Sequence, residues 1–188
     1  GDEPAPNGGR INIGFFGGTA EASKSRGGAG TYAITFNDGG ALMQTGRMEW
    51  VASTNLNGAN VALEFTTNNW ATTNLIATVP ATNEFHFWVP AFSHPRVFWR
   101  VRDPASEFAS TNDKPFSIRG TSNAAFVFYV NDSSTTNDVY CSAVGNSGNS
   151  GTASNAPLAS LRDIMAAYDL ESGDVIYMDT GNYVTPTI

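Results

Sequence analysis

Cysteine, lysine and histidine are scarce in this chain. Cys141 is its only cysteine, so an internal disulfide is excluded. Lys24 and Lys114 are its only lysines, and the formal net charge is −7. Nucleic acids and anionic membranes both attract proteins through clustered cations, so we expect neither as a partner.

Charge and long apolar runs are also scarce. Charged residues make up 14% of the chain, where about a quarter is usual in globular proteins. No stretch approaches the roughly 20 apolar residues of a membrane-spanning helix, so membrane insertion is not expected. Asn, Thr, Ser and Gly supply the polar surface instead. This composition favours a soluble protein that is extracellular or exposed at the cell surface.

The residue patterns that carry catalysis are missing as well. His86 and His94 lack the spacing of a zinc site, and Cys141 has no neighbouring cation in the sequence to activate its thiol. The sequence therefore predicts no enzymatic activity and no cofactor. The loop with Asp132 and Asp138 is the one candidate calcium site, although loop aspartates also bond their own backbone.

Residues 30–119 alternate apolar and polar side chains with a period of two, in some seven short runs separated by Gly, Asn and Pro turns. Such runs predict an antiparallel β-sandwich. The apolar positions expected to share a face are Tyr32, Ile34 and Phe36; Met48 and Trp50; Val61, Leu63 and Phe65; Leu75, Ala77 and Val79; Phe85, Phe87 and Val89; Val97, Trp99 and Val101; Phe116 and Ile118.

The strand around Phe85 carries the one tryptophan that this alternation places outside. If Phe85 and Phe87 point inward, His86 and Trp88 share the outer face. An exposed tryptophan stacks on sugar rings or is buried at a protein contact. His86 and Trp88 are therefore the candidate sugar or partner contact.

The last third of the chain follows a different pattern. The apolar run Phe126–Val130 leads into a long Asn/Ser/Thr/Gly loop. Apolar residues at helical spacing predict one helix over 157–168, with Pro157 in its first turn. Short strands are expected at Val175–Met178 and from Tyr183 onward. With residues 1–29, 30–119 and 120–188 as three parts, the sequence predicts a mostly-β protein.

Three segments resemble known families. The pattern YVND…A.G…P.ASL…YDL..GD.IY.DTG.Y in residues 125–183 resembles the start of a secreted, right-handed parallel β-helix domain of the pectate-lyase-like kind. The unit NGGRINIGFFGGTAEASKS resembles the closing coil of the same bacterial proteins. The segment between them resembles the immunoglobulin/fibronectin-like modules of bacterial surface proteins and secreted hydrolases. The resemblance implies a sandwich between the end of one β-helix and the capped start of another, with one capping α-helix.

Two functions follow from these patterns. In the first, the chain is a non-catalytic structural module that binds other copies of itself or neighbouring domains, head to tail and as a filament, through exposed strand edges. In the second, it is a carbohydrate-binding module beside a polysaccharide-degrading β-helix. The residues expected near a self-association contact are Ile11, Ile13, Phe15, Val175, Ile176 and Tyr183.

Overall fold

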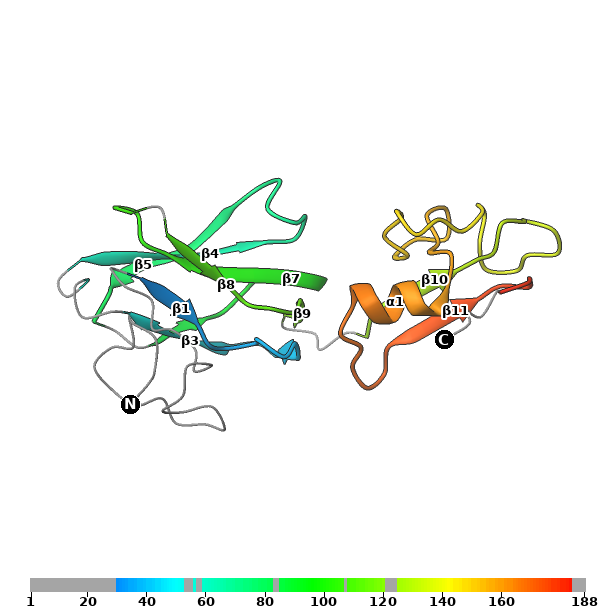
Figure 1. Cartoon of the computed structure of the whole chain (residues 1–188). Coiled ribbons are helices and arrows are strands. Elements are labelled where there is room, and N and C mark those ends of the chain that lie inside the picture. Colours follow the sequence, from blue (N-terminus) through cyan, green and yellow to red (C-terminus); the bar gives the residue numbers. More distant parts are fainter. Residues whose placement is uncertain are drawn as a thin grey trace, which may run out of the picture.

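The computed structural model describes residues 30–183, apart from 53–55, 57–58, 83–84, 107 and 121–124. Within these residues the chain consists of β-strands, loops and one α-helix, which confirms the predicted mostly-β class. Two β-sheets lie on one side of the molecule, and α1, β10 and β11 lie on the other (Figure 1). The predicted strand at 10–16, with Ile11, Ile13 and Phe15, lies outside the described residues.

The smaller sheet is antiparallel and has the strand order β1-β3-β6. Its strands are β1 (Thr31–Ala33), β3 (Gly46–Ala52) and β6 (Phe85–Trp88). Along β3, Met48 and Trp50 are buried while Val51 is exposed. This alternation is what a sheet with one face on the core and one in solvent requires.

The larger sheet has the order β2-β9-β7-β4-β5, with β8 paired to β7. Only the β2–β9 pair is parallel among these strand pairs. The strands are β2 (Ala41–Leu42), β4 (Asn60–Thr66), β5 (Asn74–Pro80), β7 (Ser93–Arg102), β8 (Ala109–Thr111) and β9 (Phe116–Arg119).

Side chains from both sheets pack into one hydrophobic core. Trp50 comes from the smaller sheet, and Trp99 lies opposite Phe65 in the larger one. The indole nitrogen of Trp99 donates to the carbonyl oxygen of Thr35 at 2.7 Å, which satisfies its one polar atom. The predicted inward positions that are fully buried are Met48, Trp50, Val61, Leu63, Val97, Trp99, Val101, Phe116 and Ile118.

The prediction for β6 was wrong, because Trp88 is buried and its aromatic neighbours are exposed. Trp88 is 8% exposed, whereas Phe87 is 59% exposed. Trp88 lies opposite Gly46 and packs against Phe65 and Phe92. Large apolar side chains occur at both odd and even positions of this strand. Period-two alternation alone therefore does not decide which side chains face inward.

The prediction for β1 was wrong for a related reason. Tyr32 and Ile34 are exposed, and the small residues Thr31 and Ala33 face the core. The Thr31 hydroxyl donates to the Val101 carbonyl at 3.1 Å, and the Ala33 N–H donates to the Ser110 hydroxyl at 3.1 Å. A strand held this close to β7 and β8 has no room for an aromatic ring on its inner face.

The C-terminal part contains β10 (Val127–Val130), α1 (Leu161–Ala167) and β11 (Val175–Met178). The helix is shorter than the predicted span. Ser160 caps it by accepting from the Asp163 N–H at 3.2 Å, while Leu158 forms a parallel bridge with Val130. Residues before Ser160 therefore extend along β10 instead of starting the helix at Pro157.

Polar contacts join the two parts of the chain. Arg119 of β9 forms a two-pronged ion pair with Asp174, just before β11. The Gly40 N–H donates to the Asp169 carboxylate, and no side chain fits at Gly39, where an added Cβ would meet that same carboxylate. Together these contacts fix the C-terminal part against the end of the larger sheet.

Candidate functional site

The first candidate site is the edge of β11. β10 and β11 pair in parallel over four residues, from Val127 opposite Val175 to Val130 opposite Met178. Within the described residues β11 has β10 as its only strand partner. The Val175 N–H donates to the Phe126 carbonyl, and the Asp179 N–H donates to the Val130 carbonyl. Parallel strands bond their neighbour at alternate residues, so the backbone groups of Ile176 and Met178 face the open edge.

Three tyrosine rings cluster around Tyr177 of β11. The rings of Tyr140 and Tyr177 stack with centroids 4.6 Å apart, and Tyr129 lies 5.8 Å from Tyr177. Val175 and Tyr177 remain exposed on the same side of β11. The result is an apolar surface next to the backbone groups that β11 directs away from β10.

A small core supports β10 and β11 from the opposite side. Its four buried residues are Phe128, Val130, Leu158 and Ile164. Ile176 and Tyr183 are half-buried and pack against this core, and the Tyr183 hydroxyl donates to the Asp179 carbonyl at 2.9 Å. Of the predicted contact residues that the structure describes, Val175 is the exposed one. Ile176 offers backbone groups to the edge rather than its side chain.

Asp179 shapes the loop at the end of β11. Its carboxylate accepts from the N–H groups of Val139, Tyr140 and Cys141 at 2.6–2.8 Å, and from Thr180 at 2.9 Å. Burial acts to raise the pKa of Asp179, but these backbone donors outweigh it and lower that pKa to about 2. The carboxylate therefore stays ionised and ties residues 139–141 to β11.

Both predicted calcium residues accept hydrogen bonds from the protein, while Oδ1 of Asp138 is buried without a hydrogen-bond partner among the described residues. Asp132 accepts from the Ser134 N–H at 2.7 Å and from the Asn182 N–H at 2.9 Å. Asp138 accepts from the amide of Asn131 at 2.6 Å. No three His, Cys, Asp or Glu side chains are grouped to hold a metal ion among the described residues.

Cys141 is a poor nucleophile in this setting. Its thiol is buried and lies 3.6 Å from the Val130 carbonyl oxygen. Burial raises the pKa of Cys141 to about 11, and the charge of Asp179 adds to the shift. The thiol is therefore protonated at neutral pH, and no thiolate is available for catalysis.

The predicted sugar contact on the sandwich has no exposed tryptophan. Trp88 is buried, and His86 is half-buried opposite Met48. The outer face of the smaller sheet instead carries Phe85 and Phe87, with the Arg47 guanidinium 4.1 Å from the Phe85 ring centre.

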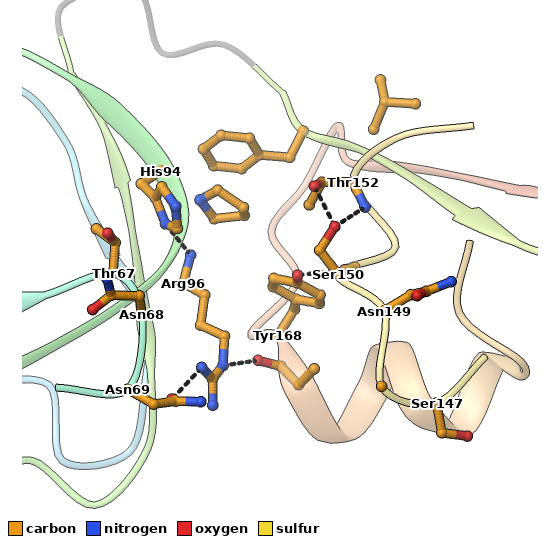
Figure 2. Close-up of a pocket in the computed structure, with 15 residues that line it drawn as sticks. Thr67, Asn68, Asn69, His94, Arg96, Ser147, Asn149, Ser150, Thr152 and Tyr168 are labelled. Atoms are coloured by element: carbon orange, nitrogen blue, oxygen red, sulfur yellow. Dashed lines mark hydrogen bonds between the residues drawn. The ribbon is translucent and has the colours of Figure 1, made fainter. Parts of the chain in front are cut away.

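A second candidate site is the cleft between the two parts of the chain, with a volume of about 790 Å³ (Figure 2). The larger sheet contributes the β4–β5 turn and the start of β7, and the C-terminal part contributes the polar loop and the end of α1. Its lining residues are Thr67, Asn68, Asn69, His94, Pro95, Arg96, Phe126, Val127, Ser147, Gly148, Asn149, Ser150, Thr152, Ala167 and Tyr168.

A bulge in β7 positions the basic side of this cleft. The register between β7 and β9 shifts between His94 and Val97, around Pro95. Proline lacks an N–H for the ladder, so inside a sheet it is confined to edges and bulges. Arg96 extends from this bulge toward α1, where its Nε donates to the Ala167 carbonyl at 3.1 Å (Figure 2).

The β4–β5 turn lies beside Arg96 on the same side of the cleft (Figure 2). The Thr66 hydroxyl accepts from the N–H groups of Asn68 and Trp70 at 3.2 and 3.0 Å. Asn69 and Trp70 both have left-handed backbone angles, with φ of 54° and 64°. A bulky residue rarely adopts this conformation outside constrained turns. The turn holds the Asn69 side chain against the Arg96 guanidinium at 2.5 Å.

Sequence reasoning missed this cleft, because its residues come from segments far apart in the chain. Two local signals were present: a proline within an otherwise regular strand, and an Asn-Asn-Trp turn. Neither signal shows that Arg96 meets the end of α1. That contact depends on the packing of the two parts against each other.

No protein-family model, curated protein or solved structure matches this chain. Among the residues that the structure describes, no helix has the length and apolar character to cross a membrane.

Proposed function

We propose that this chain is a non-catalytic structural module of an extracellular or cell-surface protein, and that it assembles by adding a strand to the edge of β11. The observation that carries the proposal is the parallel, in-register pairing of β11 with β10, with backbone groups of Ile176 and Met178 directed to the other side. Open strand edges of this kind are templates for pairing with another chain.

The parallel arrangement around β10 supports a β-helix origin for this edge. β10 contacts extended chain on both sides: β11 on one, and residues around Leu158 on the other. The Asn131 N–H donates to the Leu158 carbonyl at 3.0 Å, and the Leu158 N–H donates to the Tyr129 carbonyl at 3.0 Å. Stacked parallel segments are the repeating unit of a β-helix wall, and we propose that residues 125–183 are its capped first coil.

The two facing sheets support an immunoglobulin/fibronectin-like sandwich as the other half of the module. Both contribute to one core, and nearly all their strand pairs are antiparallel. In the proposal the sandwich acts as a spacer that presents the β11 edge at a fixed orientation. In the proposal the Arg119–Asp174 ion pair is the contact that maintains this orientation.

The added strand comes from another copy of the chain or from a neighbouring domain of the parent protein. Within the chain, the segment with Ile11, Ile13 and Phe15 has the alternating pattern of such a strand. A contact between this segment of one copy and β11 of the next is head to tail, and a head-to-tail contact that does not close produces a filament.

A non-catalytic function fits the state of the buried acidic groups. Glu64 is paired with Arg100 and Arg102, Asp174 with Arg119, and Asp179 with backbone N–H groups. Each of these carboxylates has a lowered pKa against the opposing effect of burial. Paired carboxylates held ionised in this way stabilise structure and are poor general acids at neutral pH.

Met178 offers a sharp test of the proposal. A Met178→Pro substitution removes an N–H from the open edge while the ladder bonds to β10, made by Val175 and Asp179, remain. We expect the parent chain to show concentration-dependent association by light scattering, and Met178→Pro to abolish it. Met178→Ala, which keeps the N–H, is the matched control and should associate like the parent. A parent chain that stays monomeric at millimolar concentration contradicts the proposal, as does a Met178→Pro variant that still associates.

A further inference from the structure

We infer that the cleft between the larger sheet and the C-terminal part binds a neutral, hydroxyl-rich saccharide. This site is separate from the β11 edge, and the inference does not depend on assembly. The cleft volume of about 790 Å³ lies within the usual range for ligand sites, about 300–1,000 Å³.

The chemistry of the lining identifies the class of ligand. Side chains with hydroxyl or amide groups dominate it, and no Asp, Glu or Lys is among the described residues that line it. Hydroxyls and amides both donate and accept hydrogen bonds, as sugar hydroxyls do. An apolar ligand would leave unpaired those polar atoms that make no hydrogen bond within the protein, which costs binding free energy.

Several polar atoms at the cleft have no protein partner among the described residues. They are Nη2 of Arg96, Nδ2 of Asn69 and Oδ1 of Asn149, because the bonds of these side chains use their other atoms. Two of these atoms are donors and one is an acceptor. A ligand whose groups both donate and accept satisfies all three, whereas a ligand with only acceptors does not.

Aromatic side chains line the same cleft. Tyr168 is held in place by the Ser150 carbonyl, which accepts from its hydroxyl at 2.5 Å, and by its packing on Phe128. Phe126 lies beside the start of β10 and is half-buried. Aromatic faces next to hydrogen-bonding groups provide the apolar contact that a sugar ring also requires.

The charge of the cleft argues against an acidic ligand. Of the described residues that line it, Arg96 is the one arginine and His94 the one histidine, in a chain with a formal net charge of −7. Burial lowers the pKa of His94, so this imidazole is neutral at pH 7. Two of the donor groups of Arg96 already hold Ala167 and Asn69. A polyanion would thus meet a single, partly occupied cation.

Affinity electrophoresis in native gels tests the inference with defined polymers. Dextran, glucomannan and hydroxyethylcellulose are the neutral probes, and polygalacturonate and alginate are the acidic ones. We expect retardation in at least one neutral gel, and Asn69→Gly and Asn149→Ala each to weaken the apparent affinity about 3–10-fold, as loss of one net hydrogen bond does. Glycine suits the left-handed backbone at Asn69. Asn60→Ala, at the opposite end of β4, is the matched control and should bind like the parent.

Three outcomes would overturn the inference. They are no retardation in any neutral gel, retardation in acidic gels alone, and unchanged retardation of the Asn69→Gly/Asn149→Ala double variant. A variant that fails to fold is recognised by a lost near-ultraviolet circular dichroism spectrum. In that case the inference is tested by the amide chemical shifts of the parent chain. The retarding polymer, supplied as short oligomers, should shift Asn68 and Gly148 but not Val51; shifts confined to other surfaces would exclude the cleft.

Discussion

Arg119 and Asp174 form a buried ion pair with two nearly parallel bonds, Nη1–Oδ1 at 2.9 Å and Nη2–Oδ2 at 2.8 Å. Their side chains are 2% and 3% exposed. Asp174 also accepts from the backbone N–H groups of Phe126 and Glu171. One carboxylate therefore organises the end of the larger sheet, the start of β10 and the turn before β11. It is the geometric link between the two candidate sites.

Removal of one partner from this pair should be costly. Arg119→Met leaves the Asp174 charge buried without its counter-ion, and we expect it to lower the free energy of unfolding by about 3–5 kcal/mol. The matched control is Arg47→Met, since Arg47 pairs with Glu49 at side-chain exposures of 50% and 38%. The control should cost less than about 1 kcal/mol. Urea denaturation measures the free energy of unfolding of both variants. Equal losses would contradict a larger contribution of the buried Arg119 pair to stability.

Acid should weaken the same contact. Burial acts to raise the pKa of Asp174, but bonds from Arg119 and from the Glu171 and Phe126 N–H groups lower it below the ordinary value of 3.8. A lowered folded-state pKa gives stability that is full above the unfolded-state pKa and is lost as pH falls through the folded-state value. We expect the melting temperature to fall between pH 5 and pH 2, and Asp174→Asn to show a smaller fall. An equal fall in both proteins would show that other groups control the acid response.

The thiol of Cys141 should be slow to react. Burial raises its pKa to about 11, so its rate with Ellman's reagent should climb about tenfold per pH unit from pH 7 to pH 9, without a plateau. Asp179→Asn removes a nearby negative charge and bonds to residues 139–141, so we expect faster reaction at every pH. Asp113→Asn, at an exposed carboxylate, is the control. A plateau near pH 8 would contradict the assigned environment.

Trp88 and Phe87 are neighbours in sequence that should behave oppositely. Trp88→Ala truncates a side chain that packs on Phe65 and Phe92, and we expect a loss of about 3–5 kcal/mol. Phe87→Ala changes a ring that is 59% exposed, and its effect should stay within about 0.5 kcal/mol. Thermal unfolding followed by circular dichroism distinguishes them. A larger loss for Phe87→Ala would mean that β6 faces the other way.

Local patterns in the sequence were sufficient for much of the strand content. Where apolar residues alternate with charged ones, as Met48 and Trp50 do with Arg47 and Glu49, alternation correctly predicted the buried face. Alternation failed at Phe85–Trp88, where odd and even positions both carry bulky apolar residues. There Trp88 faces inward, where it packs on Phe65 of β4 and on Phe92 just before β7.

In the C-terminal part, too, local patterns predicted the elements but not the contacts between distant residues. Apolar spacing predicted one helix and a strand at Val175–Met178, and both are present. The helix starts later than predicted because Leu158 pairs with Val130, a residue 28 positions earlier in the chain. Helical periodicity carries no information about such a pairing, since the competing bonds are made by a distant strand.

By itself, the sequence determined the mostly-β class, the scarcity of cations and the lone cysteine, because these depend on composition and on neighbours a few residues apart. The tertiary structure alone decided that Arg96 meets Ala167, that Arg119 pairs with Asp174, and that Asp179 gathers the N–H groups of residues 139–141. These partners lie 38 to 71 positions apart. A hydrogen bond or ion pair over such a separation forms only after distant segments have packed together, so no local pattern specifies it.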